Sequence, residues 1–286
     1  MKMVKEHRTK TSGTPSLKIM HVVMLIWVAL VFIPILWIAF SALKTSSSIL
    51  LDPWSWPIPP HWKNFANAWN SAGLGRGFLN SLAITTISIF TIVGTSALPA
   101  YVLGRMKFKL NRFFYYFFVS GLMFPTFIAM TPLFLLMNRL GLLDNHFGLI
   151  LVYTAYSMPF TVFILTAFFA ALPKDLEEAA MIDGSGPFRV FFQIMLPLAK
   201  PGLVSAAIFN FVGIWNEYVI ALILITDGKL KTLPVTLANL MMVMQYKTDF
   251  GALYAGIIMS IIPVIIVYLI FQKQLMSGTT SGAIKG

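Results

Sequence analysis

The chain contains no cysteine, and only 11% of its 286 residues are charged. The missing cysteine excludes disulfide bonds and thiol chemistry. The scarcity of charge, with 58% hydrophobic residues and a mean hydropathy of +0.80, lies far outside the range of ordinary globular domains. The composition therefore indicates an integral membrane protein.

Several enzyme signatures are also missing. The sequence has no His-Glu-x-x-His metal motif and no Gly-x-Ser-x-Gly nucleophile turn, and its four His residues are not clustered. A Gly-x-x-x-x-Gly-Lys-[Ser/Thr] phosphate loop is absent too, as is the series of buried Asp, Glu and His residues expected of an ion-coupled pump. Transport is the favoured class, so its energy source is either the single carboxylate of Glu217 or another chain.

Six hydrophobic runs are long enough to cross a hydrocarbon core of about 30 Å, which requires roughly 20 apolar residues in a helix. Each run is continuously apolar instead of alternating with period two, which predicts helices and not a barrel. Within them the only Asp, Glu, Lys or Arg is Glu217. The predicted spans cover residues 21–43, 78–103, 113–137, 147–171, 202–225 and 251–272.

Basic residues predict the orientation of these spans. With the N-terminus in the cytoplasm, 14 of the 21 Lys and Arg residues fall on the cytoplasmic side. The excess of basic residues on the cytoplasmic side, where the lipid is anionic, explains the net charge of +11. No nucleic-acid partner is therefore expected. The first span is longer than the 7–15 residues of a signal-peptide core, which favours an uncleaved anchor. We expect a cytoplasmic segment 1–20, a six-helix transmembrane domain 21–273 and a cytoplasmic tail 274–286.

A polar insert at about 172–201 separates the fourth and fifth predicted spans on the cytoplasmic side. Residues 173–182 predict a short helix with an acidic first turn, which suits the positive end of the helix dipole. Leu176, Ala179 and Ala180 lie at i, i+3 and i+4 and form a narrow apolar stripe of mostly small side chains.

The second half of the insert predicts a turn and another helix. Gly184 tolerates a positive φ, and Pro187 suits the first position of a helix that extends to about Leu196. Phe188, Phe191, Phe192, Met195 and Leu196 are expected to anchor this helix. The insert is therefore either a surface that docks a soluble partner or an amphipathic interfacial connector.

The insert resembles the EAA loop of ABC-importer permeases in residue types, spacing and placement. The similarity continues along the chain through Asn80-Ser81-Leu82, Ala100-Tyr101 with Arg105, Trp215-Asn216-Glu217 and the ending Gln272 to Gly286. These segments are similar to importers of the maltose/oligosaccharide type, in particular to the smaller permease of the maltose system. The residues of the EAA loop are Glu178, Ala179, Ala180, Asp183, Gly184, Ile194, Leu196 and Pro197.

The resemblance implies a division of labour. Two different permease subunits would form one pathway for a sugar, two ATPase subunits holding ATP and Mg would bind below, and an extracytoplasmic solute-binding protein would deliver the sugar. This chain would bind no cofactor or metal, would not be an enzyme, and would lie in a bacterial or archaeal cytoplasmic membrane. The insert would hold the helix that couples it to an ATPase.

Two further segments carry expectations from the resemblance. The loop at about 226–250, which includes Gln245 and Tyr246, would reach toward the binding protein. The Gly-rich tail beyond Ser277 lacks hydrophobic anchoring and is expected by composition to be disordered. The resemblance implies that this tail contacts the ATPases.

The fifth predicted span holds the candidate pathway residues. An ionised carboxylate at mid-helix costs about 2.5–3.5 kcal/mol on insertion scales, so the side chain of Glu217 should face protein or water. It either contacts sugar hydroxyls or makes an interhelical hydrogen bond, and we favour the latter. Asn210 of the same predicted span shares a face with Glu217 at i+7 and is a candidate partner for its side chain. The candidates are Asn210, Trp215, Asn216, Glu217 and Tyr218.

Two alternative functions remain open. The chain could be an ion-coupled secondary transporter that acts alone, or an ABC-importer permease for a solute other than sugar. Within the sugar reading, a disaccharide, a longer oligosaccharide, a polyol and a glycerol-phosphate compound all fit the sequence.

Overall fold

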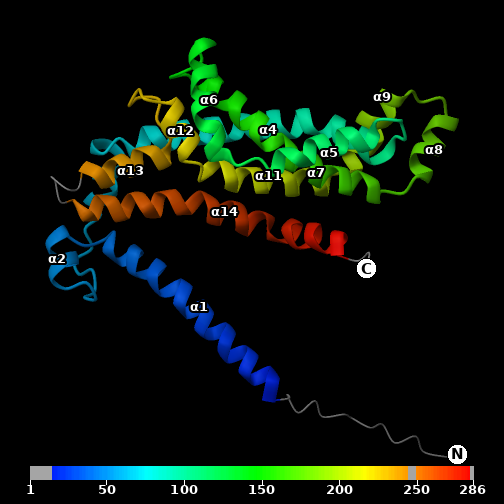
Figure 1. The fold of residues 1–286 in the computed structure, drawn as a ribbon. Coiled ribbons are helices and arrows are strands. Elements are labelled where there is room, and N and C mark those ends of the chain that lie inside the picture. Colours follow the sequence, from blue (N-terminus) through cyan, green and yellow to red (C-terminus); the bar gives the residue numbers. More distant parts are fainter. Residues whose placement is uncertain (1–14, 244–248, 284–286) are drawn as a thin grey trace, which may run out of the picture.

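The computed structural model describes residues 15–243 and 249–283. Within these ranges the regular structure is entirely helical, which confirms the predicted all-α class. Four helices are long and apolar enough to cross a membrane, and six spans result if each of two bent helix pairs counts as one. The four long helices are α1 (Pro15–Ser41), α4 (Leu74–Arg105), α7 (His146–Ala171) and α14 (Phe250–Ala283) (Figure 1).

The third predicted span is not a straight helix. It consists of α5 (Asn111–Leu122) and α6 (Thr126–Arg139), which meet at an angle of 96°. Pro125 lies at the break as the residue before α6, where its missing N–H costs no helical hydrogen bond. The chain therefore bends at Pro125, whereas Pro132 and Pro159 lie inside α6 and α7.

The fifth predicted span, 202–225, is wrong as a continuous helix. Helix α11 (Lys200–Trp215) ends ten residues early, and α12 (Val219–Leu224) begins after a break at 216–218. At its other end α11 is bent by 70° against the preceding helical segment 187–198. The side chain of Glu217 at the break accounts for the interruption, because its carboxylate accepts hydrogen bonds from the backbone N–H groups of Ile220 and Ala221.

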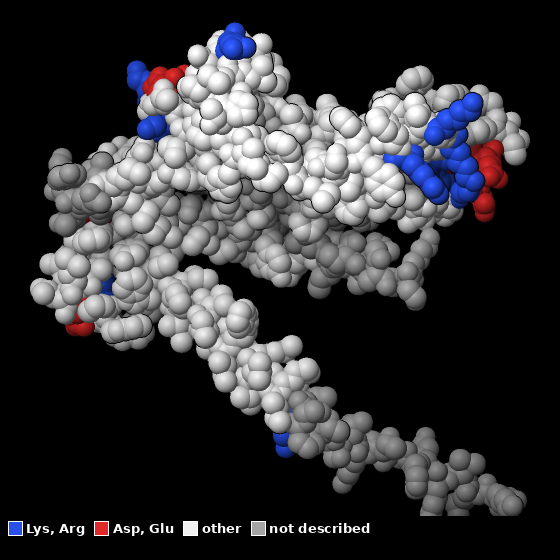
Figure 2. Space-filling model, in the orientation of Figure 1, with Lys and Arg blue, Asp and Glu red and all other residues white. Residues whose placement is uncertain are grey.

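Short helices gather at one end of the bundle, which we call the α13 end (Figure 1). The opposite end carries the insert and is called the α8 end. Figure 2 shows charged side chains at these two ends, at the tip of α6 and near the start of α1, with an uncharged surface between the two ends of the bundle. The short elements of the α13 end are α2 (Ser46–Leu51), α3 (Lys63–Ala66), the π-helix η1 (Asn67–Ser71) and α13 (Leu233–Val243).

Helices α4, α7 and α11 form the centre of the bundle, and α14 packs against α11. A small residue permits close packing of α4 on α7, because a Cβ at Gly104 would lie 2.8 Å from the carbonyl oxygen of Thr166. Helix α1 instead projects away from the bundle, and its residues 18–36 are all exposed (Figure 1). The central helices therefore position the candidate site.

The structure tests the expectation for the C-terminal tail but not those for the N-terminal segment and the loop at 226–250. The backbone of α14 remains helical to Ala283, so the expected disorder beyond Ser277 is wrong. Once a helix is nucleated in an apolar span, adding residues at its end costs little. Residues 1–14 of the expected cytoplasmic segment, residues 284–286, and Gln245 and Tyr246 of the loop lie outside the described residues.

Candidate functional site

The insert folds as a helix, a tight turn and a second helical segment. Helix α8 (Asp175–Ile182) ends at a turn in which the Ser185 N–H donates to the carbonyl oxygen of Ala180 over 2.9 Å. Gly184 in this turn has φ +80°, which glycine adopts without steric cost. The predicted helix, positive-φ glycine and Pro187 helix start are confirmed. The second segment consists of α9 (Pro187–Val190), the π-helix η2 (Phe191–Met195) and α10 (Leu196–Leu198).

The second segment is packed firmly against α4 and α7. Val190 and Met195 are fully buried and share one hydrophobic cluster with Leu165 of α7. The Phe191 ring lies 5.1 Å from that of Tyr101 in α4, measured between ring centroids. Of the five expected anchors, Phe191 and Met195 are buried and Leu196 half-buried, but Phe188 and Phe192 are exposed. The exposed rings leave this end of the molecule with an apolar surface.

The buried residues of helix α8 are not the ones that the predicted apolar stripe contains. Ala180 is buried, but Leu176 and Ala179 are exposed, so the stripe does not form a single face. The second inward residue is Glu177, which lies three residues before Ala180. The stripe prediction is wrong because the carboxylate residue Glu177, and not Leu176, turns inward beside Ala180.

The remaining residues of the EAA-type motif divide between the outer surface and the packed interior. Glu178, Asp183 and Gly184 are exposed together with Ala179, on and just beyond α8. Further along, Ile194 and Leu196 are half-buried and Pro197 is exposed. The motif thus combines an exposed helix with a buried support.

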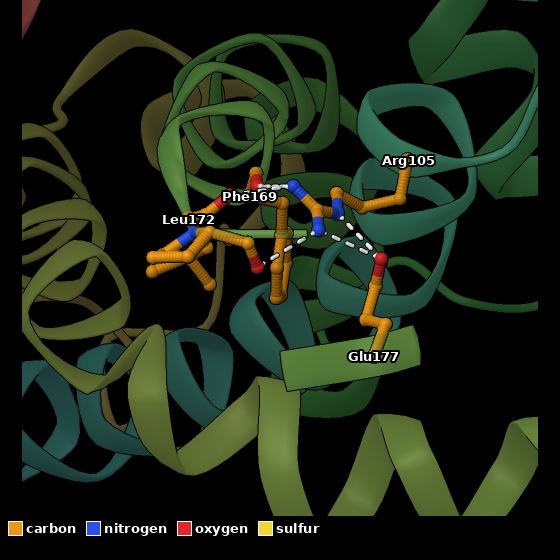
Figure 3. A network of polar contacts seen from close by, with 5 residues as sticks. Arg105, Phe169, Leu172 and Glu177 are labelled. Carbon is orange, nitrogen blue, oxygen red and sulfur yellow. Dashed lines mark hydrogen bonds and ion pairs between the residues drawn. The ribbon is translucent and has the colours of Figure 1, made fainter. Parts of the chain in front are cut away.

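One ion pair fixes the start of α8, and sequence reasoning missed it. The Arg105 Nε and Nη2 atoms donate to the same Glu177 carboxylate oxygen over 2.9 and 2.7 Å (Figure 3). The two side chains are only 3% and 12% exposed. The signal that could have found it is that Arg105 lies just after a predicted span and Glu177 lies in the insert, both on the predicted cytoplasmic side. A charge that becomes buried there needs a partner of opposite sign.

The same guanidinium group also closes the end of α7. Its Nη1 atom donates to the carbonyl oxygen of Leu172 over 2.6 Å and to that of Phe169 over 3.5 Å. Its Nη2 atom donates to the carbonyl oxygen of Pro173 over 3.1 Å. Cations suit the C-terminal end of a helix, where carbonyl groups lack helical partners.

Among the candidate pathway residues, Glu217 has a structural role. Its carboxylate accepts hydrogen bonds from the backbone N–H groups of Ile220 and Ala221 over 2.7 and 3.1 Å. It also accepts one from the Tyr153 hydroxyl of α7 over 2.7 Å. The side chain therefore caps α12 and ties it to α7, which explains why the fifth span breaks at 216–218.

The interhelical hydrogen bond favoured for Glu217 is present, but its partner was predicted wrongly. Asn210 instead donates to the Thr161 hydroxyl over 2.9 Å and to the Ala206 carbonyl oxygen over 2.8 Å. The break turns Glu217 off the continuous helical face that i+7 spacing assumes.

The other three candidates lie in different surroundings. Trp215 is 1% exposed and donates from its indole N–H to the Ser260 carbonyl oxygen over 2.9 Å. Asn216 is exposed and Tyr218 is half-buried. Glu217 thus caps α12 and Trp215 lies in the core, whereas Asn216 is the exposed polar residue at the break.

Residues 96–279 match the family of binding-protein-dependent transport system inner membrane components. The chain belongs to this family. The matched region begins in α4, contains the whole insert and ends in α14. This permease is therefore a multi-pass membrane component of a transport system.

The permease has relatives that cover nearly its full length. It is 40% identical to a diacetylchitobiose uptake system permease of Streptomyces coelicolor, over 93% of this chain and 88% of the relative. It is 36% identical to a trehalose transport system permease of Mycobacterium tuberculosis, over 89% and 92%. It is 32% identical to a melibiose/raffinose/stachyose import permease of Bacillus subtilis, over 97% and 100%. The relatives are thus permeases of sugar transport systems.

A solved structure has the same fold. A chain of a bacterial ABC transporter involved in the import of the acidic polysaccharide alginate superposes with a TM-score of 0.79 at 24% identity. The match covers 91% of this permease and 98% of the other chain. The permease therefore has the fold of an ABC-importer subunit.

At the α13 end, polar side chains hold the loop between α12 and α13. The Asp144 carboxylate accepts hydrogen bonds from the N–H groups of Thr226 and Asp227 over 2.5 and 2.8 Å, and from the Thr226 hydroxyl over 2.6 Å. The Asn80 amide donates to the carbonyl oxygens of Lys229 and Lys231 over 3.0 and 2.9 Å. This loop is therefore fixed to α4 and to the α6–α7 connection.

We expect an Asp144→Asn variant to loosen this loop. Hydrogen bonds from the Thr226 hydroxyl, then from the Asp227 and Thr226 amides, hold the pKa of Asp144 below its usual range. The stabilisation is present above the unfolded carboxyl pKa of about 3.9 and is lost as pH falls through the lower folded pKa. Hydrogen exchange at the amides of residues 226 and 227 should become several-fold faster in the variant at pH 7.

Asparagine at this position keeps the local backbone, because it tolerates the φ of 49° found at Asp144. Asp175→Asn, an exposed acidic residue at the opposite end, is the matched control and should leave exchange at 226 and 227 unchanged. Equal exchange rates in the wild type and Asp144→Asn would contradict the role of this carboxylate.

Proposed function

We propose that this chain is a transmembrane permease subunit of an ATP-driven sugar importer, in which it forms the pathway with a second, different permease. The observation that carries the proposal is the insert: an exposed short helix, α8, supported by a buried segment that packs on α4 and α7. Such an arrangement offers a rigid surface to a soluble partner.

The exposed surface of α8 has the chemistry of a docking site. Ile182 is 86% exposed and Met181 56% exposed, and Ile182 lies three residues after the exposed Ala179, on the same side of the helix. Large apolar side chains exposed at the end of a membrane protein, outside its spans, favour a protein partner. In our proposal Glu178, Ala179, Asp183 and Gly184 contact an ATPase subunit, while Ala180, Ile194, Leu196 and Pro197 support that contact.

Orientation follows from the same proposal. The α8 end faces the cytoplasm, with both chain termini, and two ATPase subunits holding ATP and Mg bind there. The α13 end faces outward, where the fixed loop between α12 and α13 receives an extracytoplasmic solute-binding protein. The membrane is then the cytoplasmic membrane of a bacterium or archaeon.

The relatives support a sugar as the transported solute. Their names specify diacetylchitobiose, trehalose and melibiose/raffinose/stachyose, so a di- or oligosaccharide is the class that we propose. Along the pathway, exposed Asn216 at the 216–218 break is the candidate for contact with sugar hydroxyls.

Reconstitution in liposomes tests the proposal. The complex purified from its native membrane by a tag on this chain should contain a second permease and ATPase subunits. With its binding protein, the complex should take up diacetylchitobiose, trehalose or melibiose into proteoliposomes. Uptake should occur only when ATP is present on the side of the membrane where the ATPase subunits lie. The chain purified alone should be inert under a proton or sodium gradient.

Three outcomes would overturn parts of this proposal. Gradient-driven uptake by the single chain would establish a secondary transporter instead. ATP-dependent uptake of an amino acid or phosphate but of no sugar would replace the solute class. Copurification without any ATPase subunit would remove the coupling role of α8.

A further inference from the structure

A single buried ion pair links α8 directly to the ends of two central helices. Arg105 is the last residue of α4, and Glu177 lies in the first turn of α8. From the same guanidinium group, hydrogen bonds reach the carbonyl oxygens of Phe169, Leu172 and Pro173 at the end of α7 (Figure 3). One side chain therefore joins three elements.

Apart from this ion pair, α8 reaches the central helices through Ala180, which shares a hydrophobic cluster with residues of α4 and α7. In the described chain it packs chiefly against α9 and η2 of the insert, and Ala180 is its other buried residue. The connection from α7 to α8 is short, covering residues 172–174. Without the Arg105–Glu177 contact, α8 would be held to α4 and α7 by this connection, by packing within the insert and by the apolar contact of Ala180, with no polar contact at its first turn.

The chemistry of the pair suits a rigid joint. Guanidinium is planar and presents its N–H donors in a fixed fork, so several simultaneous hydrogen bonds fix its orientation. Both side chains are shielded from water, and a buried charge that loses its partner is strongly unfavourable. The three elements should therefore move together instead of sliding past one another.

We propose that Arg105 and Glu177 are positioning residues that transmit displacement of α8 to α4 and α7. This inference rests on the proposed contact between α8 and an ATPase. Helix α4 has 32 residues and is thus about 48 Å long, which carries movement from the α8 end to the loop held by Asn80. Helix α7 carries it to Tyr153 and the capped break at Glu217.

The test measures sugar transported per ATP hydrolysed by the complete complex with its binding protein. The double variant Arg105→Gln/Glu177→Gln removes both charges together, so neither is left buried without a partner. It should retain its ATPase subunits and an ATPase rate within about two-fold of wild type, while the transport ratio falls at least about ten-fold. Lys107→Gln, which removes an exposed cation two residues from Arg105, is the matched control and should leave the ratio unchanged.

Rescue distinguishes transmission from simple folding support. The natural chain has no cysteine, so Arg105→Cys/Glu177→Cys introduces the only two thiols of this subunit. A bifunctional thiol reagent that bridges them should restore the transport ratio, and the same reagent on either single variant should not. A wild-type ratio in the double Gln variant, or a loss that only follows reduced complex yield, would overturn the inference. Failure of the wild-type complex to transport with ATP would instead overturn the proposed function.

Discussion

An Ala179→Arg variant is expected to insert into the membrane and fold but to lose ATP-dependent sugar uptake. Ala179 is exposed on α8, so the larger side chain meets solvent and not the core in the isolated subunit. In the complex it would place a long charged side chain in a closely packed contact with the ATPase, where an unpaired charge loses its hydration. The measurement is the amount of ATPase subunit that copurifies with the variant, together with uptake in proteoliposomes.

The matched control is Ala66→Arg, which makes the same change at an exposed alanine in α3 at the opposite end. It should leave ATPase copurification at the wild-type level. Normal copurification and normal uptake in Ala179→Arg would show that this face of α8 does not dock the ATPase. A variant that fails to reach the membrane would contradict the exposure of this position.

The backbone of the insert could be predicted from sequence because its signals are local. An acidic first turn, a glycine after the last helical residue and a proline at the next helix start each act within a few residues. The structure reproduces these features at Glu178, Gly184 and Pro187. Long apolar spans were predictable for a similar reason, since the bilayer requires about 20 apolar residues in any helix that crosses it.

Contacts between distant residues were not predictable from the sequence alone. Arg105 and Glu177 lie 72 residues apart, and their pairing depends on how α4, α7 and the insert pack. For the same reason Glu217 was assigned to Asn210 on its own helix, whereas its side-chain partner is Tyr153 on α7. Hydropathy averaged over a whole span did not separate 216–218 from its neighbours, because the residues before and after these positions are as apolar as those of a continuous span.

The largest expected loss of stability belongs to Glu217→Ala. The substitution removes the acceptor for the Tyr153 hydroxyl and for the backbone N–H groups of Ile220 and Ala221, which are 2% and 0% exposed as residues. A buried polar group without a partner costs about 1–3 kcal/mol, and hydrocarbon offers no water to replace the lost acceptor. The midpoint of thermal unfolding in detergent should fall markedly.

Graded substitutions separate this capping role from contact with sugar. Glu217→Gln keeps one acceptor oxygen and should lose less stability than Glu217→Ala, while Tyr153→Phe removes one donor, leaves the cap and should lose least. The neighbouring Asn216→Ala is the control, because its amide donates only within α11, to the Val212 carbonyl oxygen, and its loss should leave stability unchanged.

Contact with the transported sugar would give the opposite pattern, in which Glu217→Gln unfolds like wild type but raises the sugar concentration needed for half-maximal uptake. Because the carboxylate is already occupied by three donors from the protein, we expect that kinetic effect at Asn216, whose side chain is exposed at the same break.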